Sequence, residues 1–181
     1  MRPWMEGQGS AMKAFLARFL GTSPAPLPAE GLYAAVVAEG RQPHWYRHGG
    51  VEDSVTGRFN MIATVLSFVL LRLEREPGAM ATGVALTERF IDDMEGQLRQ
   101  DGVGDTGVAA KMGKLVSLLG GRLGAFRDSF GTTEFEAALV RNLYAGAHPA
   151  RPALAHSVAK LEEFAARLAA APLDAIEAGR W

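Results

Sequence analysis

The chain of 181 residues has the length of one ordinary domain, and its hydrophobic fraction of 48% is enough for a buried core. Its 19 basic and 20 acidic residues leave a net charge of -1, so no overall positive charge attracts the protein to DNA. The absence of cysteine excludes disulfides, thiolate metal sites and cysteine nucleophiles.

The first 28 residues are predicted to form a separate N-terminal segment. Apolar side chains recur at helical spacing between residues 11 and 20, and a stiff proline-rich linker, Ser23–Pro28, follows them. Lys13 and Arg18 interrupt the apolar patch, which argues against a secretory signal, so we expect a cytoplasmic protein. The apolar face of this helix is expected to pack on the protein's own body. The alternative is weak peripheral docking on the inner membrane.

Residues 29–181 are predicted to form a single compact all-α domain of about six to seven helices, because apolar residues recur at helical spacing and no alternating strand pattern occurs. We expect helices near 30–39, 54–75, 80–100, 108–130, 133–144 and 153–171, followed by a short C-terminal turn. The segment between residues 41 and 50 is predicted to be a loop rich in aromatic and histidine side chains.

The helix expected over residues 54–75 is predicted to lie at the centre of the fold. Its apolar run, Met61–Leu71, is bounded by Arg58 and Arg72 and is shorter than the roughly 20 apolar residues that a spanning helix needs. A helix that is apolar on nearly every side is typical of a buried position. We therefore predict a core helix and not a membrane span.

The glycine-rich segment Gly102–Gly107 matches the letters of the dinucleotide-binding fingerprint. That fingerprint requires a strand before it, whereas a helix is predicted to precede this segment. We expect a helix-to-helix turn, with Gly102 in a left-handed conformation and Asp105 or Thr106 as the next N-cap. The sequence therefore predicts no nucleotide cofactor.

Two histidines of the predicted loop, His44 and His48, are four residues apart, a spacing that can place two imidazoles on one metal ion. Proline 43 and the following glycine pair leave room for one helical turn at most, and no third ligand is apparent nearby. We therefore expect no metal site. His148 and His156 are expected at the surface or at helix caps.

Asp92, Asp93 and Glu95 form an acidic cluster that could serve general acid and base chemistry. Neighbouring side chains on a helix diverge by about 100°, however, so a solvated face is the simpler interpretation. Asp93 and Arg58 each flank an apolar stripe, and we expect both to be partly buried and paired, so that losing either would be costly.

Lys111, Lys114 and Arg122, with Arg127 further along, fall on the helix predicted over residues 108–130. They form either a solvated face or a local positive patch for an anionic partner such as ribosomal RNA or a lipid headgroup. The sequence contains no Gly-x-Ser-x-Gly elbow, no Walker lysine and no His-Glu-x-x-His motif, so binding is favoured over catalysis.

Four segments, in order, resemble the ubiquinol–cytochrome c chaperone family. They lie at Leu32–Tyr46, Val51–Met61, Phe90–Lys114 and Gly121–Tyr144. The second segment, Val-Glu-Asp-Ser-Val-Thr-Gly-Arg-Phe-Asn-Met, is similar to that family's Val-x-Asp-Thr-x-x-Gly-Arg-Phe-Asp-Met. Asn60 stands where the family usually has an acid, and His48-Gly49 replaces a more typical acidic-Leu pair.

The resemblance implies an all-helical assembly chaperone, not an enzyme, which holds newly made cytochrome b during biogenesis of the respiratory cytochrome b–c complex. Mitochondrial relatives work at the ribosomal exit tunnel, which makes the ribosome a second expected partner. No DNA partner, metal or cofactor is implied. The candidate partner-binding residues are Trp45, Tyr46, Arg58, Phe59, Asp93, Asp105, Lys111, Lys114 and Arg122.

Several alternatives remain open at this point. Trp45, Tyr46 and Phe59 can equally be explained by packing in the core. A helical haem or small-molecule carrier would have its pocket between the helices predicted over residues 54–75 and 80–100. An enzyme would need a noncontiguous site around His44, Arg58 and Asp93.

Overall fold

A computed structural model describes residues 29–100 and 105–181, and it contains helices and no strand within these two ranges. The helices are α2 (Glu30–Gly40), α3 (Pro43–Arg47), α4 (Val55–Leu73), α5 (Met80–Gln100), α6 (Asp105–Ser129), α7 (Phe135–Asn142), α8 (Arg151–Ala170) and α9 (Leu173–Glu177). The all-α prediction is confirmed. The helix predicted over residues 11–20 and most of the glycine-rich turn lie outside the described residues.

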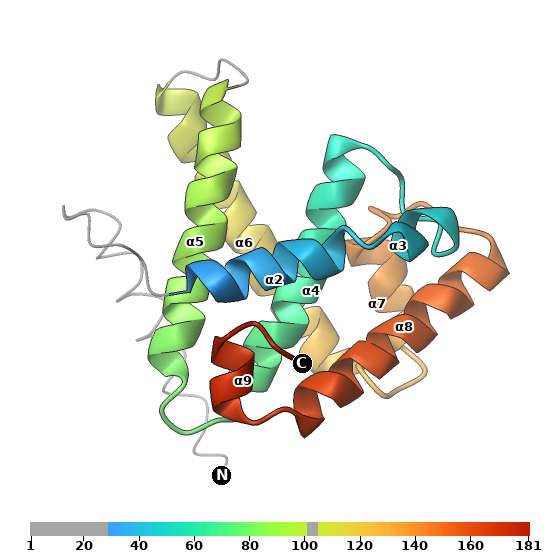
Figure 1. The fold of residues 1–181 in the computed structure, drawn as a ribbon. Helices are drawn as coiled ribbons and strands as arrows, with labels where there is room; N and C mark the ends of the chain where they lie inside the picture. Colours follow the sequence, from blue (N-terminus) through green and yellow to red (C-terminus); the bar gives the residue numbers. More distant parts are fainter. Residues whose placement is uncertain (1–28, 101–104) are drawn as a thin grey trace, which may run out of the picture.

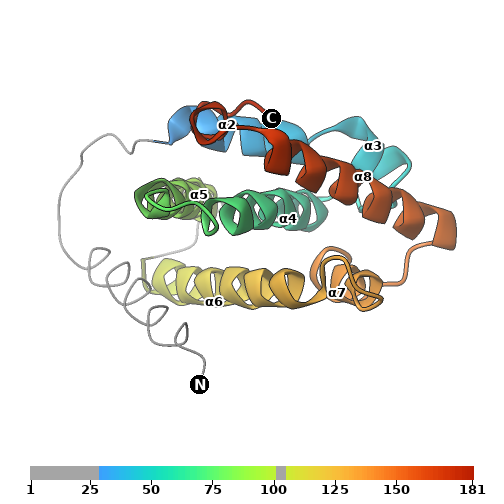
Figure 2. The ribbon, with the colours of Figure 1, turned by 90° about the horizontal axis from the view of Figure 1, so that it is seen from below.

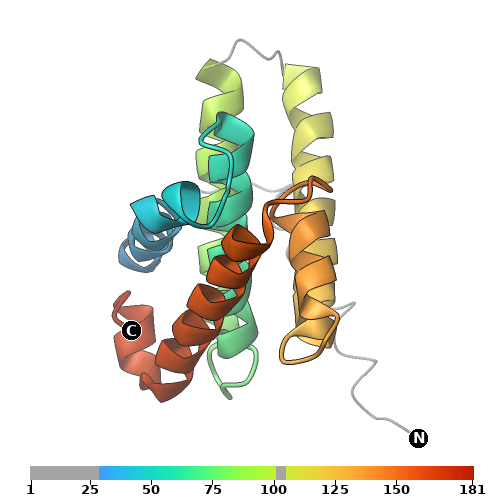
Figure 3. The same ribbon diagram turned by 90° about the vertical axis from the view of Figure 1, so that its right-hand side faces the viewer.

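The helices form three layers, which are clearest in Figure 2. The middle layer holds α4 and α5, with α6 and α7 on one side of it and α2, α8 and α9 on the other. Figures 1 and 3 show that α8 crosses the layer of α4 obliquely, whereas α6 runs alongside it. Helix α4 therefore has neighbours on two opposite faces.

Helix α4 begins with a capped turn and continues into the core. The side chain of Ser54 accepts a hydrogen bond from the backbone N–H of Gly57 at 3.1 Å, which satisfies one of the free donors of the first turn. By length and composition, Val55–Leu73 is long and apolar enough to cross a membrane, although the apolar run Met61–Leu71 alone is too short. However, 67% of its most apolar 18-residue stretch is buried inside the protein. The prediction of a core helix is confirmed.

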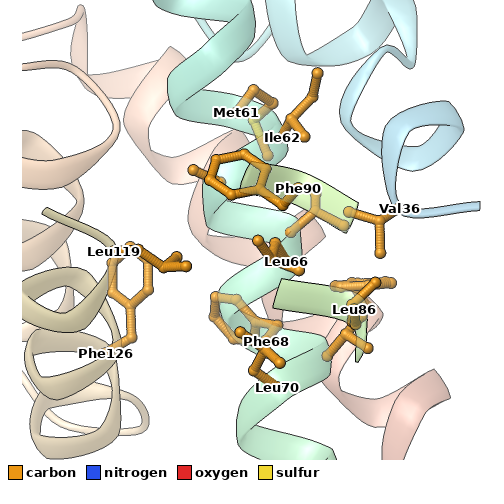
Figure 4. Close-up of a cluster of buried hydrophobic side chains, with 14 of the residues drawn as sticks. Val36, Met61, Ile62, Leu66, Phe68, Leu70, Leu86, Phe90, Leu119 and Phe126 are labelled. Carbon is orange, nitrogen blue, oxygen red and sulfur yellow. The ribbon is translucent and has the colours of Figure 1, made fainter. Parts of the chain in front are cut away.

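The core consists of apolar side chains that α4 presents to both of its neighbouring layers (Figure 4). Leu66 and Phe68 of α4 are buried, with Phe90 of α5 and Phe126 of α6 packed in the same cluster. Burial of aromatic and branched side chains supplies about 1.5–3 kcal/mol each relative to exposure, so this cluster is the main source of stability.

The prediction of a loop between residues 41 and 50 is wrong over the short helix α3. Pro43 stands in the first turn of that helix, where its fixed φ angle suits helical geometry and its missing N–H costs no hydrogen bond. Trp45 then turns inward, and its indole Nε1 donates to the carbonyl oxygen of Glu39 at 2.9 Å. Burying the Trp45 ring while its N–H keeps a hydrogen bond stabilises this helical turn relative to an irregular loop.

Leu66 and Leu118 provide a matched test of where the core lies. Leu66 is fully buried, whereas the side chain of Leu118 on α6 is 51% exposed. We expect Leu66→Ala to lower the free energy of unfolding by about 2–5 kcal/mol because it leaves a cavity. Leu118→Ala should change it by less than about 0.5 kcal/mol. Urea denaturation of both variants measures the difference, and equal losses would contradict this assignment of the core.

Gly57 and Gly113 both lie inside helices but have opposite surroundings. A Cβ atom added at Gly57 would lie 1.9 Å from the carbonyl oxygen of Glu52, whereas nothing lies within 4 Å of one added at Gly113. We expect Gly57→Ala to destabilise the protein by about 1–3 kcal/mol through overpacking. Gly113→Ala should stabilise it by about 0.5–1 kcal/mol through helix propensity. Thermal unfolding of the two variants should therefore shift in opposite directions.

Candidate functional site

The side chain of Arg122 is buried where α6 meets α4 and α7, with 6% of the residue exposed. Its Nη1 donates to the carbonyl oxygen of Asn60 at 3.1 Å, and its Nη2 donates to Asn60 Oδ1 at 3.0 Å and to the carbonyl oxygen of Asn142 at 2.6 Å. No carboxylate pairs with it in the part of the chain that the structure describes. Burial therefore lowers the pKa of Arg122 to about 10.

This burial divides the group of cations predicted on α6. Lys111 and Lys114 are exposed, as a positive patch requires. Arg122 faces the interior and cannot contribute to such a patch, and Arg127 is paired with Glu74 at 2.7 Å. Two lysines of the four predicted cations thus remain as an exposed positive pair on this helix.

Arg58 and Asp93 are predicted to be partly buried and paired; both are paired, but both are exposed. Arg58 Nε lies 2.6 Å from Asp53 Oδ1, and the two side chains are 56% and 60% exposed. Asp93 is also exposed and accepts a hydrogen bond from the Tyr33 hydroxyl at 2.7 Å. Water screens such pairs, so the large cost of breaking a buried pair does not apply to them.

The three aromatic candidates differ in exposure. Trp45 is fully buried, so the core-packing alternative holds for it. Tyr46 and Phe59 are half-buried. The Tyr46 hydroxyl donates to the carbonyl oxygen of Gly40 at 2.7 Å, and the ring of Phe59 packs 5.7 Å from that of Phe90. The side chain of the remaining candidate, residue 105, lies outside the described residues.

A groove opens where the C-terminal ends of α4, α6 and α8 meet, and we call it the α4–α6–α8 groove. Its volume is about 280 Å³. Its lining consists of Phe68, Leu71, Arg72, Glu74, Arg75, Phe126, Arg127, Phe130, Ala165, Leu168 and Ala169. Of the residues singled out from the sequence as functional candidates, Arg127 lines it, and none of the nine candidate partner-binding residues does, so sequence reasoning missed the groove itself.

The floor of the α4–α6–α8 groove is aromatic. The ring centroid of Phe68 lies 5.6 Å from that of Phe126 and 5.1 Å from that of Phe130, the latter at an interplanar angle of 86°. Phe68 and Phe126 are buried, whereas Phe130 is half-exposed. Edge-to-face packing of this kind holds the rings in place and leaves a rigid apolar surface.

The rim of the groove carries more arginine than carboxylate. Arg72 Nε donates to the carbonyl oxygen of Leu168 at 2.9 Å, which fastens α8 to α4. Arg127 bonds both carboxylate oxygens of Glu74, at 2.7 and 2.8 Å. Arg75 is exposed, and its side chain has no ion pair within ranges 29–100 and 105–181. The groove therefore suits an apolar segment that bears a negative charge.

The three residues weighed for a noncontiguous catalytic site have separate partners. His44 contacts His156 on α8, Arg58 pairs with Asp53 just before α4, and Asp93 accepts a hydrogen bond from Tyr33 on α2. None of the three lines the groove, whose lining includes one carboxylate and no histidine, serine or lysine. The groove also lies on α4, α6 and α8 and not between α4 and α5, where a carrier pocket was expected.

Comparisons with known proteins agree with this picture. A family model described as ubiquinol-cytochrome C chaperone matches residues 47–181. The crystal structure of the Cbp3 homolog from Brucella abortus is similar, with 26% sequence identity, a TM-score of 0.71, and coverage of 94% of this chain and 89% of that one. No curated protein matches the chain.

Asn60 is the residue that decides how the buried charge of Arg122 is compensated. We expect Asn60→Asp to raise the free energy of unfolding by about 1–3 kcal/mol, because it turns a neutral hydrogen bond of a buried cation into a charge-assisted one. Asn60→Leu should lower it by about 1–3 kcal/mol, since it removes the side-chain acceptor. Chemical denaturation at pH 7 measures both, and a less stable Asn60→Asp protein would contradict this account.

Proposed function

The chain belongs to the ubiquinol–cytochrome c chaperone family, and we propose that it holds newly made cytochrome b while the respiratory cytochrome b–c complex is assembled. The observation that carries the proposal is the extent of the family match, residues 47–181, which contain α4 to α9 and every residue that lines the α4–α6–α8 groove. Chaperones of this family assist assembly by binding, so an apolar binding surface is the feature to test.

The chemistry of the groove supports this choice of client. Cytochrome b is an apolar membrane subunit, and its newly made segments have apolar side chains that water disfavours. The aromatic floor around Phe68 would cover such side chains, and the exposed Arg75 at the rim would pair with an acidic group beside them. A shallow groove covers a segment without enclosing it, which allows later transfer to partner subunits.

We propose that the protein works in the cytoplasm beside the inner membrane, where cytochrome b is inserted. The ribosome near its exit tunnel is the second proposed partner, and the exposed pair Lys111 and Lys114 would meet its RNA. The docking of residues 11–20 on the membrane remains a prediction, because that helix lies outside the described residues.

Substitutions at the rim of the groove test the proposal with little risk to the fold. Arg75 is exposed, so Arg75→Glu should leave the melting temperature nearly unchanged. Leu71 is half-buried against the core, so Leu71→Gln should lower it slightly while the protein still folds. We expect each to reduce the amount of newly translated cytochrome b that co-purifies with the protein by about tenfold, which corresponds to about 1.4 kcal/mol of binding. Leu118→Gln is the matched control, because Leu118 is an exposed leucine that does not line the groove.

The two possible failures test the binding surface and the client separately. If both rim variants retain cytochrome b as the unmodified protein does, the groove is not the binding surface. If the unmodified protein retains no cytochrome b in a reaction that does translate membrane proteins, the proposed client is wrong.

A further inference from the structure

Three histidines meet at the corner between α3 and α8. His44 lies within α3, His48 is the residue that ends this helix, and His156 lies on α8. The Nδ1 atom of His44 is 3.1 Å from the Nε2 atom of His156. The ring centroid of His156 lies 5.3 Å from that of His44 and 5.7 Å from that of His48. Two elements far apart in the chain thus bring three imidazoles together.

Buried polar contacts beside the histidines keep this corner rigid. The hydroxyl of Tyr144 donates to the carbonyl oxygen of Gly49 at 2.6 Å, and that of Ser157 lies 3.3 Å from the same oxygen. A Cβ atom at Gly49 would lie 2.6 Å from the carbonyl oxygen of Trp45 and 2.7 Å from Ser157 Oγ. Because only glycine allows this close approach, the segment that carries His48 is held directly against α8.

The histidines are open to solvent, and each imidazole has a ring nitrogen that can bind a metal ion. His48 is exposed and His44 and His156 are half-buried, so an ion can enter from water.

We propose that His44, His48 and His156 form a binding site for a divalent transition-metal ion. Zinc–imidazole bonds of about 2.0–2.1 Å in tetrahedral geometry place adjacent nitrogens about 3.3 Å apart, close to the 3.1 Å that separates His44 from His156. As they lie among the described residues, no three histidine, cysteine or carboxylate side chains are close enough together to hold a metal ion, so the third ligand has to move. The site therefore forms when the exposed His48 side chain turns toward the pair, and water occupies the fourth position.

Metal binding replaces the hydrogen bond between His44 and His156. The ring that donates this bond moves its proton to its other nitrogen, so the ion meets two lone pairs and no net proton is released. Three imidazoles favour Zn²⁺, Cu²⁺ or Ni²⁺, whereas Mg²⁺ and Ca²⁺ prefer oxygen ligands. The nearest charged groups on α8, Lys160 and Glu163, pair with each other at 2.6 Å and leave the imidazoles as the ligands.

Trp45 supplies a spectroscopic test, because its ring lies 4.2 Å from that of His44. We expect Cu²⁺ or Ni²⁺ added to the tag-free protein to quench part of the tryptophan fluorescence with a stoichiometry of one ion per chain. Zn²⁺ should bind at the same site in isothermal titration and raise the melting temperature, since it joins α3 to α8. Mg²⁺ should do neither.

Glutamine variants identify the ligands, because glutamine keeps much of the size and polarity of histidine. We expect His156→Gln and His48→Gln to weaken Zn²⁺ binding by about tenfold or more and to abolish the shift in melting temperature. His148→Gln is the control, since His148 is exposed and does not contact the cluster. Unchanged binding in His156→Gln, unchanged binding in His48→Gln, or no stoichiometric binding by the unmodified protein would each overturn the proposal. None of these results depends on the client of the chaperone.

Discussion

The hydrogen bonds of one buried guanidinium hold the layer of α6 and α7 against the central helix α4. Arg122 on α6 bonds Asn60 on α4 and the carbonyl oxygen of Asn142 at the end of α7, so a single side chain fixes three helices relative to one another. A buried cation is costly unless its donors are satisfied, and this arrangement satisfies both Nη atoms of Arg122 while its Nε finds no partner among the described residues, so the cost favours the helix positions that supply these acceptors. The burial of α4 and the position of the groove both depend on that arrangement.

The central position of α4 explains why the same helix contributes to stability and to binding. Most residues of α4 pack in the core, and those at its C-terminal end remain buried there on one side while Leu71 and Arg72 line the groove on the other. Arg72 connects these two parts by donating to the carbonyl oxygen of Leu168, which holds α8 at the edge of the groove. An apolar surface beside a rigid core suits a protein that binds an apolar client and later releases it.

The two proposed binding surfaces lie on different parts of the fold and have different chemistry. The α4–α6–α8 groove combines aromatic rings with arginine and suits a peptide segment. The histidine corner lies on α3 and α8 and brings together His44, His48 and His156. A metal ion there would join the two elements and leave the groove open.

The sequence by itself determined the long helices and the family, although not the short helix α3. Apolar spacing within each segment identifies a helix and its buried stripe, because this periodicity is a local property of the chain, and the Val51–Met61 segment carries the resemblance that the family match bears out. Only the tertiary structure decided which stripes face each other. It buried Arg122, left Arg58 exposed beside Asp53, and brought His44 to a histidine 112 residues away. Such contacts depend on packing between distant segments, which local periodicity does not contain.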